Sequence, residues 1–296
     1  MKKIAFLASV AVLLTFAACT REEPLRPKSG QPITVDAGIG VLTRATTTGD
    51  SEKFDIGDKV ALYVWTGNSQ NVPANLVVNG VENTLQSDGS WVPASVMYWQ
   101  DFNTAHFFLG IYPARTVSDF KADSFTLKAG DYEANDLLVA TEFSGLTATN
   151  DPVKLNFKHA MARLQVNMNF RNQFASTPTV AVSAKVASSC KVNYLTGTVD
   201  PGEQGSFALT KLASAAEGYA LSCSSIVIPQ SGFRTVILTI EGTDFVYTHD
   251  VDIQLSAGSV TVLNLTVGRD KIELDSDLTI EDWTSRSPLN GEAQDE

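Results

Sequence analysis

The feature that most constrains this chain is a strict alternation of apolar residues with small or polar ones over positions 33–41. The odd positions hold Ile33, Val35, Ala37, Ile39 and Val41. Because successive side chains on a strand point to opposite faces, this pattern predicts a β-strand with one apolar face. Arg44 and several small polar residues follow. A strand that should be buried, next to a basic residue that should be exposed, suggests a segment that is held in place and then released by a cut between Arg44 and Ala45.

The C-terminal run, residues 272–283, repeats this pattern near the other end of the chain. Its even positions are largely apolar and its odd positions largely acidic, so it predicts a second strand with one apolar and one charged edge. We treat it as a candidate donor strand, that is, a strand that another molecule could accept into its sheet. Its apolar set is Ile272, Leu274, Leu278 and Ile280.

Between the two runs, short strand-like segments recur with Gly, Pro, Asn or Asp between them. Val60–Trp65 reads as a strand, and the Asn79–Gly80 pair is the usual signal of a tight hairpin. No segment has the period and length of an ordinary helix. Short strands at regular spacing are typical of antiparallel sandwiches rather than βαβ units. We therefore predict an all-β fold of two tandem antiparallel β-sandwich domains, residues 45–160 and 161–296.

The N-terminus reads as an export signal. Two lysines precede an uncharged, largely apolar run of fifteen residues that ends before Cys19. As a helix this run would span about 22 Å, short of the ~30 Å hydrocarbon core, so residues 1–18 predict a signal peptide rather than an anchor helix. The small residues before Cys19 resemble a bacterial lipobox, which implies lipidation of its thiol; an ordinary signal peptide with an incidental Cys is the alternative. Residues 19–44 would then be a lipidated pro-segment that carries a placeholder strand.

Charge and composition narrow the possible partners. The chain has 33 acidic and 22 basic residues, a formal net charge of −11. Such a surface repels phosphate backbones and anionic lipid, so we expect no nucleic-acid partner. The apolar share of 44% in 296 residues can fill real cores, which excludes a disordered protein.

No catalytic residue, cofactor site or metal site is expected. His106, His159 and His249 lack metal-ligand spacing, and the chain contains neither a nucleophile elbow nor a phosphate-binding loop. Asp55 and Asp58 offer too few oxygens for calcium and read as a turn. The four tryptophans could line a sugar-binding platform, but core packing is the commoner fate of Trp beside a strand.

Two cysteines remain after Cys19. Cys190 and Cys223 both lie in the second half, and an exported protein permits a disulfide between them. Two buried free thiols are the alternative, since the sequence does not fix their geometry.

Short motifs occur in a definite order over nearly the whole chain. They are the lipobox at Cys19, LTRA at 42–45, FDIGDKVALY at 54–63, YWQD at 98–101, IYP at 111–113, DLLVA at 136–140, LNFKHAMARL at 155–164, IPQ at 228–230 and IEDW at 280–283. On these motifs the chain resembles the fimbrillin (type V pilin) family of Bacteroidales. The resemblance implies transthyretin-like sandwich domains and a surface-exposed outer-membrane lipoprotein. It also implies cleavage after Arg44 by an Arg-specific surface protease of the gingipain type, and polymerisation with other fimbrial subunits.

Two classes of function remain open. In the first, the chain is a structural subunit of a fimbrium: the strand before Arg44 leaves its groove after the cut, and the C-terminal run of a neighbour replaces it by β-augmentation. In the second, it is a non-polymerising surface lipoprotein or a fimbrial tip adhesin that binds glycan or host protein. Its C-terminal run is then an integral strand, and Arg44 need not be cut. An enzyme has no support in the sequence.

Overall fold

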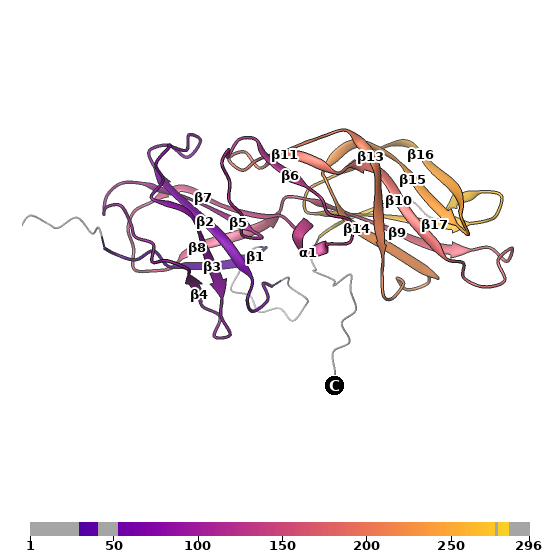
Figure 1. The fold of residues 1–296 in the computed structure, drawn as a ribbon, viewed down its shortest axis with the longest axis horizontal. Coiled ribbons are helices and arrows are strands. Elements are labelled where there is room, and N and C mark those ends of the chain that lie inside the picture. Colours follow the sequence, from indigo (N-terminus) through magenta and orange to yellow (C-terminus); the bar gives the residue numbers. More distant parts are fainter. Residues whose placement is uncertain (1–29, 41–52, 276–277, 284–296) are drawn as a thin grey trace, which may run out of the picture.

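The computed structural model describes residues 30–40, 53–275 and 278–283. As the strand spacing predicts, the chain is all-β with two β-domains. Figure 1 shows the two main sheets toward opposite ends of an elongated molecule, with the short helix α1 (Tyr132–Asn135) between them. None of the helices in the described part of the chain is long and apolar enough to cross a membrane.

The first lobe is built on a seven-stranded sheet with the strand order β1-β8-β7-β5-β2-β3-β4. In that order the strands are β1 (Val35–Ile39), β8 (Val153–His159), β7 (Leu138–Leu146), β5 (His106–Tyr112), β2 (Lys59–Thr66), β3 (Val78–Leu85) and β4 (Trp91–Pro93).

The second lobe is built on a nine-stranded sheet with the order β16-β15-β10-β13-β14-β9-β17-β18, in which β19 also pairs with β17. In that order the strands are β16 (Thr243–Leu255), β15 (Gln230–Ile240), β10 (Val180–Ala187), β13 (Gln204–Lys211), β14 (Leu221–Val227), β9 (Ala162–Phe170), β17 (Ser259–Val267), β18 (Ile272–Leu274) and β19 (Thr279–Asp282).

Two pairings depart from the antiparallel pattern expected from short connections. β1 runs parallel to β8, and β9 runs parallel to β17, whereas the other strand pairs in the described residues are antiparallel. Both parallel pairs join segments far apart in the sequence, so no hairpin connects them. Local periodicity therefore predicts these strands but not their partners.

A third, three-stranded sheet joins the two halves of the chain. Its order is β12 (Thr198–Pro201), β11 (Ser189–Asn193) and β6 (Asp123–Thr126), so β6 from the first half pairs with β11 from the second. The main chain itself passes from one main sheet to the other between His159 and Ala162. The two lobes are therefore linked by backbone hydrogen bonds as well as by the chain.

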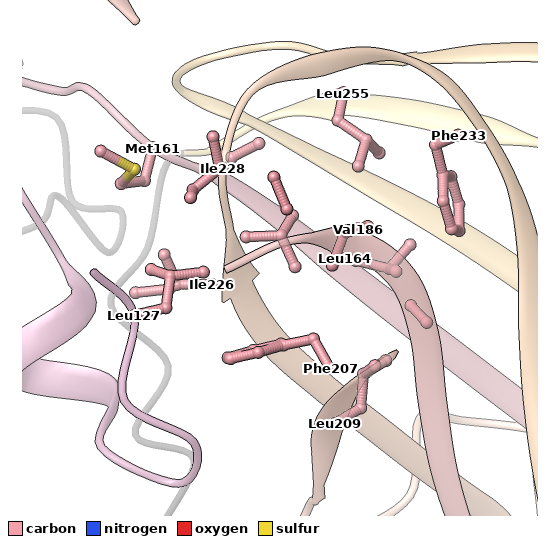
Figure 2. Packing of buried hydrophobic residues seen from close by; sticks show 14 of the residues in the cluster. Leu127, Met161, Leu164, Val186, Phe207, Leu209, Ile226, Ile228, Phe233 and Leu255 are labelled. Carbon is pink, nitrogen blue, oxygen red and sulfur yellow. The ribbon is translucent and has the colours of Figure 1, made fainter. Parts of the chain in front are cut away.

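The central strand β2 of the first sheet is buried on both faces. Val60, Leu62 and Val64 point into the core inside the first lobe, while Ala61 and Tyr63 point toward the larger core that continues into the second lobe. β2 therefore reads as one uninterrupted apolar run, as expected for a strand covered on both sides. In Figure 2, Leu127, which follows β6, is drawn among the buried residues of the second lobe's cluster.

The expected hairpin at Asn79–Gly80 is wrong. Both residues lie inside β3, where the register with β2 shifts between Leu62 and Tyr63. Gly80 has φ +65°, and a Cβ atom there would lie 2.9 Å from the Tyr63 hydroxyl oxygen. The glycine thus serves a bulge beside a buried tyrosine, not a two-residue turn.

Candidate functional site

The candidate site is the edge of the first sheet that β1 occupies. β1 pairs in parallel with β8, and Val35 lies opposite Val153 while Ile39 lies opposite Phe157. Backbone bonds at both ends fix this register: Val153 N donates to Thr34 O (2.8 Å), and Gly40 N donates to Phe157 O (3.0 Å). The predicted strand over 33–41 is therefore present over Val35–Ile39, at a sheet edge.

The other side of the same segment is also paired. Ile33 N donates to Met97 O (2.8 Å), and Trp99 N donates to Gln31 O (3.1 Å). Further along, the indole Nε1 of Trp91 donates to Ala37 O (3.2 Å). The segment 31–39 thus bridges β8 and the stretch around β4, and without it both would present unpaired backbone groups.

The predicted apolar face of this segment points inward. Ile33 is 1% exposed and Val35 is 7% exposed, whereas Ala37 and Ile39 are partly buried against the same core. We call the trough that receives these four side chains the groove. Its wall on the β8 side is formed by Val153, Leu155 and Phe157, all buried. The groove is therefore apolar within, and deepest at the end that holds Ile33.

Phe157 in the groove wall needs a glycine opposite it on β5. A Cβ atom at Gly110 would lie 2.6 Å from Phe157 Cζ. We expect Gly110→Ala to push Phe157 toward β1 and to lower the free energy of unfolding by about 1–3 kcal/mol, the usual cost of overpacking. Urea titration measures this. Gly205→Ala is the matched control, because a Cβ there meets nothing within 4 Å; equal losses in both variants would contradict the close-contact explanation.

The C-terminal run lies at the edge of the second sheet of its own molecule. β18 pairs with Leu265–Val267 and β19 pairs with Ser259–Val262, both on β17 and both antiparallel. Ile272, Leu274 and Leu278 are partly buried against the second-lobe core. Ile280 is 52% exposed, so the run does not present the unbroken apolar edge that its alternation suggests.

Trp283 at the end of this run packs against the first lobe. Its indole stacks on the ring of His159, the last residue of β8, with centroids 3.9 Å apart and planes 7° from parallel. His159 Nδ1 in turn lies 2.7 Å from Asp136 Oδ1, and both side chains are buried. Tyr132 meets Trp283 edge to face at 6.3 Å. We call Asp136, His159 and Trp283 the joint; three of the motifs behind the family resemblance meet here.

The four tryptophans are all buried, which removes the sugar-binding platform. Trp65, Trp91, Trp99 and Trp283 are each less than 10% exposed. Trp91 and Trp99 border the groove, so these two tryptophans contribute to the candidate site through core packing.

His106 is a neutral ring that packs against Trp99, one of the residues bordering the groove. Its Nε2 accepts a hydrogen bond from Gln100 N (3.1 Å), and its Nδ1 lies 2.8 Å from Thr104 O, to which it donates. The ring also packs edge to face on Trp99 at 4.9 Å. Burial disfavours the charged form and lowers the pKa of His106 below its usual value.

This shift predicts a pH dependence of stability. Unfolded His106 titrates near its usual pKa of ~6.5 and so binds a proton more readily than the folded ring, which means that stability falls as the pH drops through about 6.5. We expect His106→Gln to show a smaller loss of unfolding free energy between pH 7 and pH 5 than wild type, measured by urea titration. His249→Gln is the control, and an unchanged pH slope in His106→Gln would refute the assignment.

The possible disulfide is not formed. Cys190 lies in β11 of the three-stranded sheet and Cys223 in β14 of the nine-stranded sheet, and both are buried free thiols. Their strands are not neighbours, so nothing in the sheet order brings the two sulfurs together. Burial raises the pKa of Cys190 to about 12 and that of Cys223 to about 11, which keeps both thiols protonated and unreactive.

The remaining predicted site residues, Cys19, Arg44 and Ala45, lie outside the described residues. In the described ranges no group of three or more His, Cys, Asp or Glu side chains is placed to hold a metal ion.

The second lobe carries a polar hollow of about 380 Å³ on the outer face of β9, β17 and β19. One wall presents Gln165 and Asn167, which are hydrogen-bonded to each other (3.0 Å), and Asn167 Nδ2 donates to Asn264 Oδ1 (2.9 Å). Tyr219 closes one side. Arg163, buried at the same wall, donates from Nε to Ser224 Oγ (2.9 Å).

Comparison with known proteins agrees with this architecture. The sequence profile described as fimbrillin-like matches residues 43–283. A crystal structure of a protein from Bacteroides uniformis ATCC 8492, assigned to cell adhesion, is 21% identical, with a TM-score of 0.64, 88% of this chain covered and 100% of that one. A second, from Bacteroides ovatus ATCC 8483 and likewise assigned to cell adhesion, is 16% identical, with a TM-score of 0.64, 86% of this chain covered and 99% of that one.

These two likenesses establish the fold, and the profile match covers most of the chain. None of the curated proteins matches this chain. The matched profile describes fimbrillin-like proteins, a structural rather than an enzymatic family. The chain belongs to the fimbrillin-like family.

Proposed function

We propose that this chain is a structural subunit of surface fimbriae that is exported as a lipoprotein and assembled by strand exchange. The lipid on Cys19 holds the precursor at the outer membrane, and β1 fills the groove as a placeholder. An Arg-specific surface protease cuts the Arg44–Ala45 bond, which separates the lipid and β1 from the rest of the subunit. The observation that carries the proposal is the position of β1, an edge strand that the sequence joins to its lobe through the segment holding Arg44.

The strength with which β1 is held suits a temporary occupant. Ile33, just before β1, and Val35 within it are the two buried apolar side chains of the segment 31–39, worth roughly 1.5–3 kcal/mol each, or about 3–6 kcal/mol together. Its backbone bonds add about 0.5–1.5 kcal/mol each. While the chain is intact, the connection keeps β1 at a high effective concentration beside the groove. After the cut, only these contacts keep β1 in the groove, and the translational freedom that β1 would gain on leaving works against them. A strand that binds the groove more tightly can therefore displace β1.

The C-terminal run is the segment best placed to be that strand. It has the same alternation, and the described part of the run, residues 272–275 and 278–283, forms two short edge strands of three and four residues in its own molecule. Donating it leaves the order of the other strands in the second sheet unchanged. An apolar groove with unpaired backbone on both sides accepts such a strand by β-augmentation.

A digestion of purified residues 20–296 with an Arg-specific protease tests the proposal. We expect one early cut, after Arg44, followed by ladders of multimers that survive SDS. Mass spectrometry of the products should show residues 20–44 absent from the ladders. Rapid cutting at other arginines with Arg44 intact, or complete cutting at Arg44 that yields only monomer, would contradict the shaft role.

The polar hollow favours a second function, that of a glycan-binding adhesin. Amide and guanidinium groups beside an aromatic ring, as at Gln165, Asn264, Arg163 and Tyr219, are suited to sugar hydroxyls and to the apolar face of a sugar ring. Titration of the ¹⁵N-labelled protein with neutral oligosaccharides tests this function. Shifts confined to residues around the hollow, and lost in Tyr219→Ala, would support it, whereas no shift at millimolar sugar would reject it.

A further inference from the structure

The outer face of β8 carries two lysines that the placeholder strand uses poorly. Lys154 and Lys158 are exposed, with Asn156 between them on the same face, while Leu155 and Phe157 point into the core. The register of β1 puts Asp36 beside Lys154. One residue beyond the paired positions Ile39 and Phe157, Lys158 falls beside Gly40, which offers no side chain. The β8 edge of the groove therefore carries two lysines, whereas β1 places only one acidic residue, Asp36, beside them.

We call the place in the groove that holds one inward side chain its seat. The seat of Ala37 limits which strand can replace β1. The inward side chains of the placeholder are large at Ile33, Val35 and Ile39, but small at Ala37, whose carbonyl accepts from the Trp91 indole. The C-terminal run has the matching order, because its even positions are Ile, Leu, Ser, Leu and Ile from 272 to 280. Moving the run by two residues in either direction puts a leucine in the small seat. Moving it by one turns the acidic edge inward, which is costly for unpaired carboxylates.

Ser276 is the middle residue of these five even positions. It therefore falls in the small seat of Ala37 whether the strand runs parallel or antiparallel to β8. Three features of the groove distinguish the two directions. In a parallel strand, Lys158 meets Thr279; in an antiparallel strand, it meets Glu273. Lys154 meets an acidic residue in both cases. Opposite charges directly across two strands stabilise the pair, so the lysines favour the antiparallel direction.

Burial of apolar side chains favours the same direction. An antiparallel strand puts Ile280, which is 52% exposed in its own molecule, at the place of Ile33, which is 1% exposed. It also puts Trp283 at the place of Gly30, beside an open hollow of about 580 Å³. That hollow is lined by Leu76, Val77, Tyr98 and Trp99 among others. A parallel strand would carry Trp283 away from this hollow.

We propose that a second copy of this chain inserts its C-terminal run antiparallel to β8, with Ile280 in the seat of Ile33, Leu278 in that of Val35 and Leu274 in that of Ile39. Glu273 then lies beside Lys158, and Trp283 fills the hollow at Gly30. The inference rests on the proposed strand exchange and adds its direction and register. It also supplies a driving force, because a parallel edge pair is replaced by an antiparallel one with better charge matching and more buried apolar surface.

Paired cysteines in otherwise intact residues 20–296 test the direction. Lys158→Cys with Glu273→Cys should give a reducible bond between subunits after digestion at Arg44, since facing residues lie within disulfide reach. Lys158→Cys with Thr279→Cys should not. Undigested protein shows whether either pair bonds within one molecule, and peptide mapping confirms which sulfurs are joined.

A charge exchange supplies a test without cysteines. Lys158→Glu should slow ladder formation at least fivefold, and adding Glu273→Lys should restore it, whereas Lys185→Glu, an exposed change in β10, should have no effect. A bond through Thr279→Cys, or ladders that form without either bond, would overturn the proposed register while leaving strand exchange intact. Absence of ladders in the wild-type digest would instead reject strand exchange itself.

Discussion

Replacing Arg44 with Ala is expected to leave the precursor uncut at this bond and to abolish the SDS-resistant ladders. The physical reason is that β1 stays covalently joined to the subunit, so its high effective concentration keeps the groove filled against any incoming strand. Wild-type and variant proteins are compared after identical digestion with an Arg-specific protease. The measured quantities are the fraction cut between Arg44 and Ala45 and the fraction of protein in multimers, which should fall from a majority to background.

A second variant shows whether the cut itself is what matters. Residues around Arg44 are exchanged for the recognition sequence of an unrelated protease, with the rest of residues 20–296 unchanged. This protein should stay monomeric with the Arg-specific enzyme and form ladders with the unrelated one. Ladders from Arg44→Ala would show that β1 does not block assembly, and the placeholder role would then be wrong.

The sequence predicts strands more reliably than it predicts their partners. The alternation at 33–41 correctly indicates a one-sided strand, and the apolar run at Val60–Trp65 correctly indicates β2. Neither pattern shows that β1 lies parallel to β8, since that pairing joins residues more than a hundred positions apart. Pairing depends on which distant apolar faces fill the same core, and this information is spread over the whole chain.

The Asn79–Gly80 pair shows a local signal overruled by packing. The dipeptide supplies a residue that tolerates positive φ, which a hairpin turn and a bulge both require. In this chain the buried Tyr63 needs space beside Gly80, and the strand continues through the pair as β3. Sequence alone thus identifies the backbone requirement, whereas the neighbouring side chain decides how it is used.

The joint is the part of the candidate site that sequence reasoning missed. Asp136, His159 and Trp283 each belong to a motif that supports the family resemblance, but no spacing rule connects them. A carboxylate 2.7 Å from a buried ring nitrogen, with an indole stacked at 3.9 Å, is visible only in the folded chain. The joint also connects the two ends of the proposed exchange, because β8 lines the groove with Val153–Phe157 and holds Trp283 through His159.

Trp283→Ala is expected to release the C-terminal run from its own sheet without unfolding either lobe. Removing a buried Trp costs about 3–5 kcal/mol in general, and here that loss falls mainly on two short edge strands. At about 1.4 kcal/mol per factor of ten, the run should open roughly 10² to 4 × 10³ times more often. Amide hydrogen exchange measures this opening directly, through peptides that cover 272–283.

The internal control for this prediction is amide exchange elsewhere in the same molecule. Peptides from β2 and β15 report on the two cores and should keep wild-type protection in Trp283→Ala. Ile280→Ala, which trims a half-exposed side chain in the same strand, should change exchange of the run by less than tenfold. If exchange of 272–283 stays at the wild-type rate, Trp283 does not hold the run. If protection is lost throughout both lobes, the run is an integral part of the fold, and a subunit could not donate it while remaining folded.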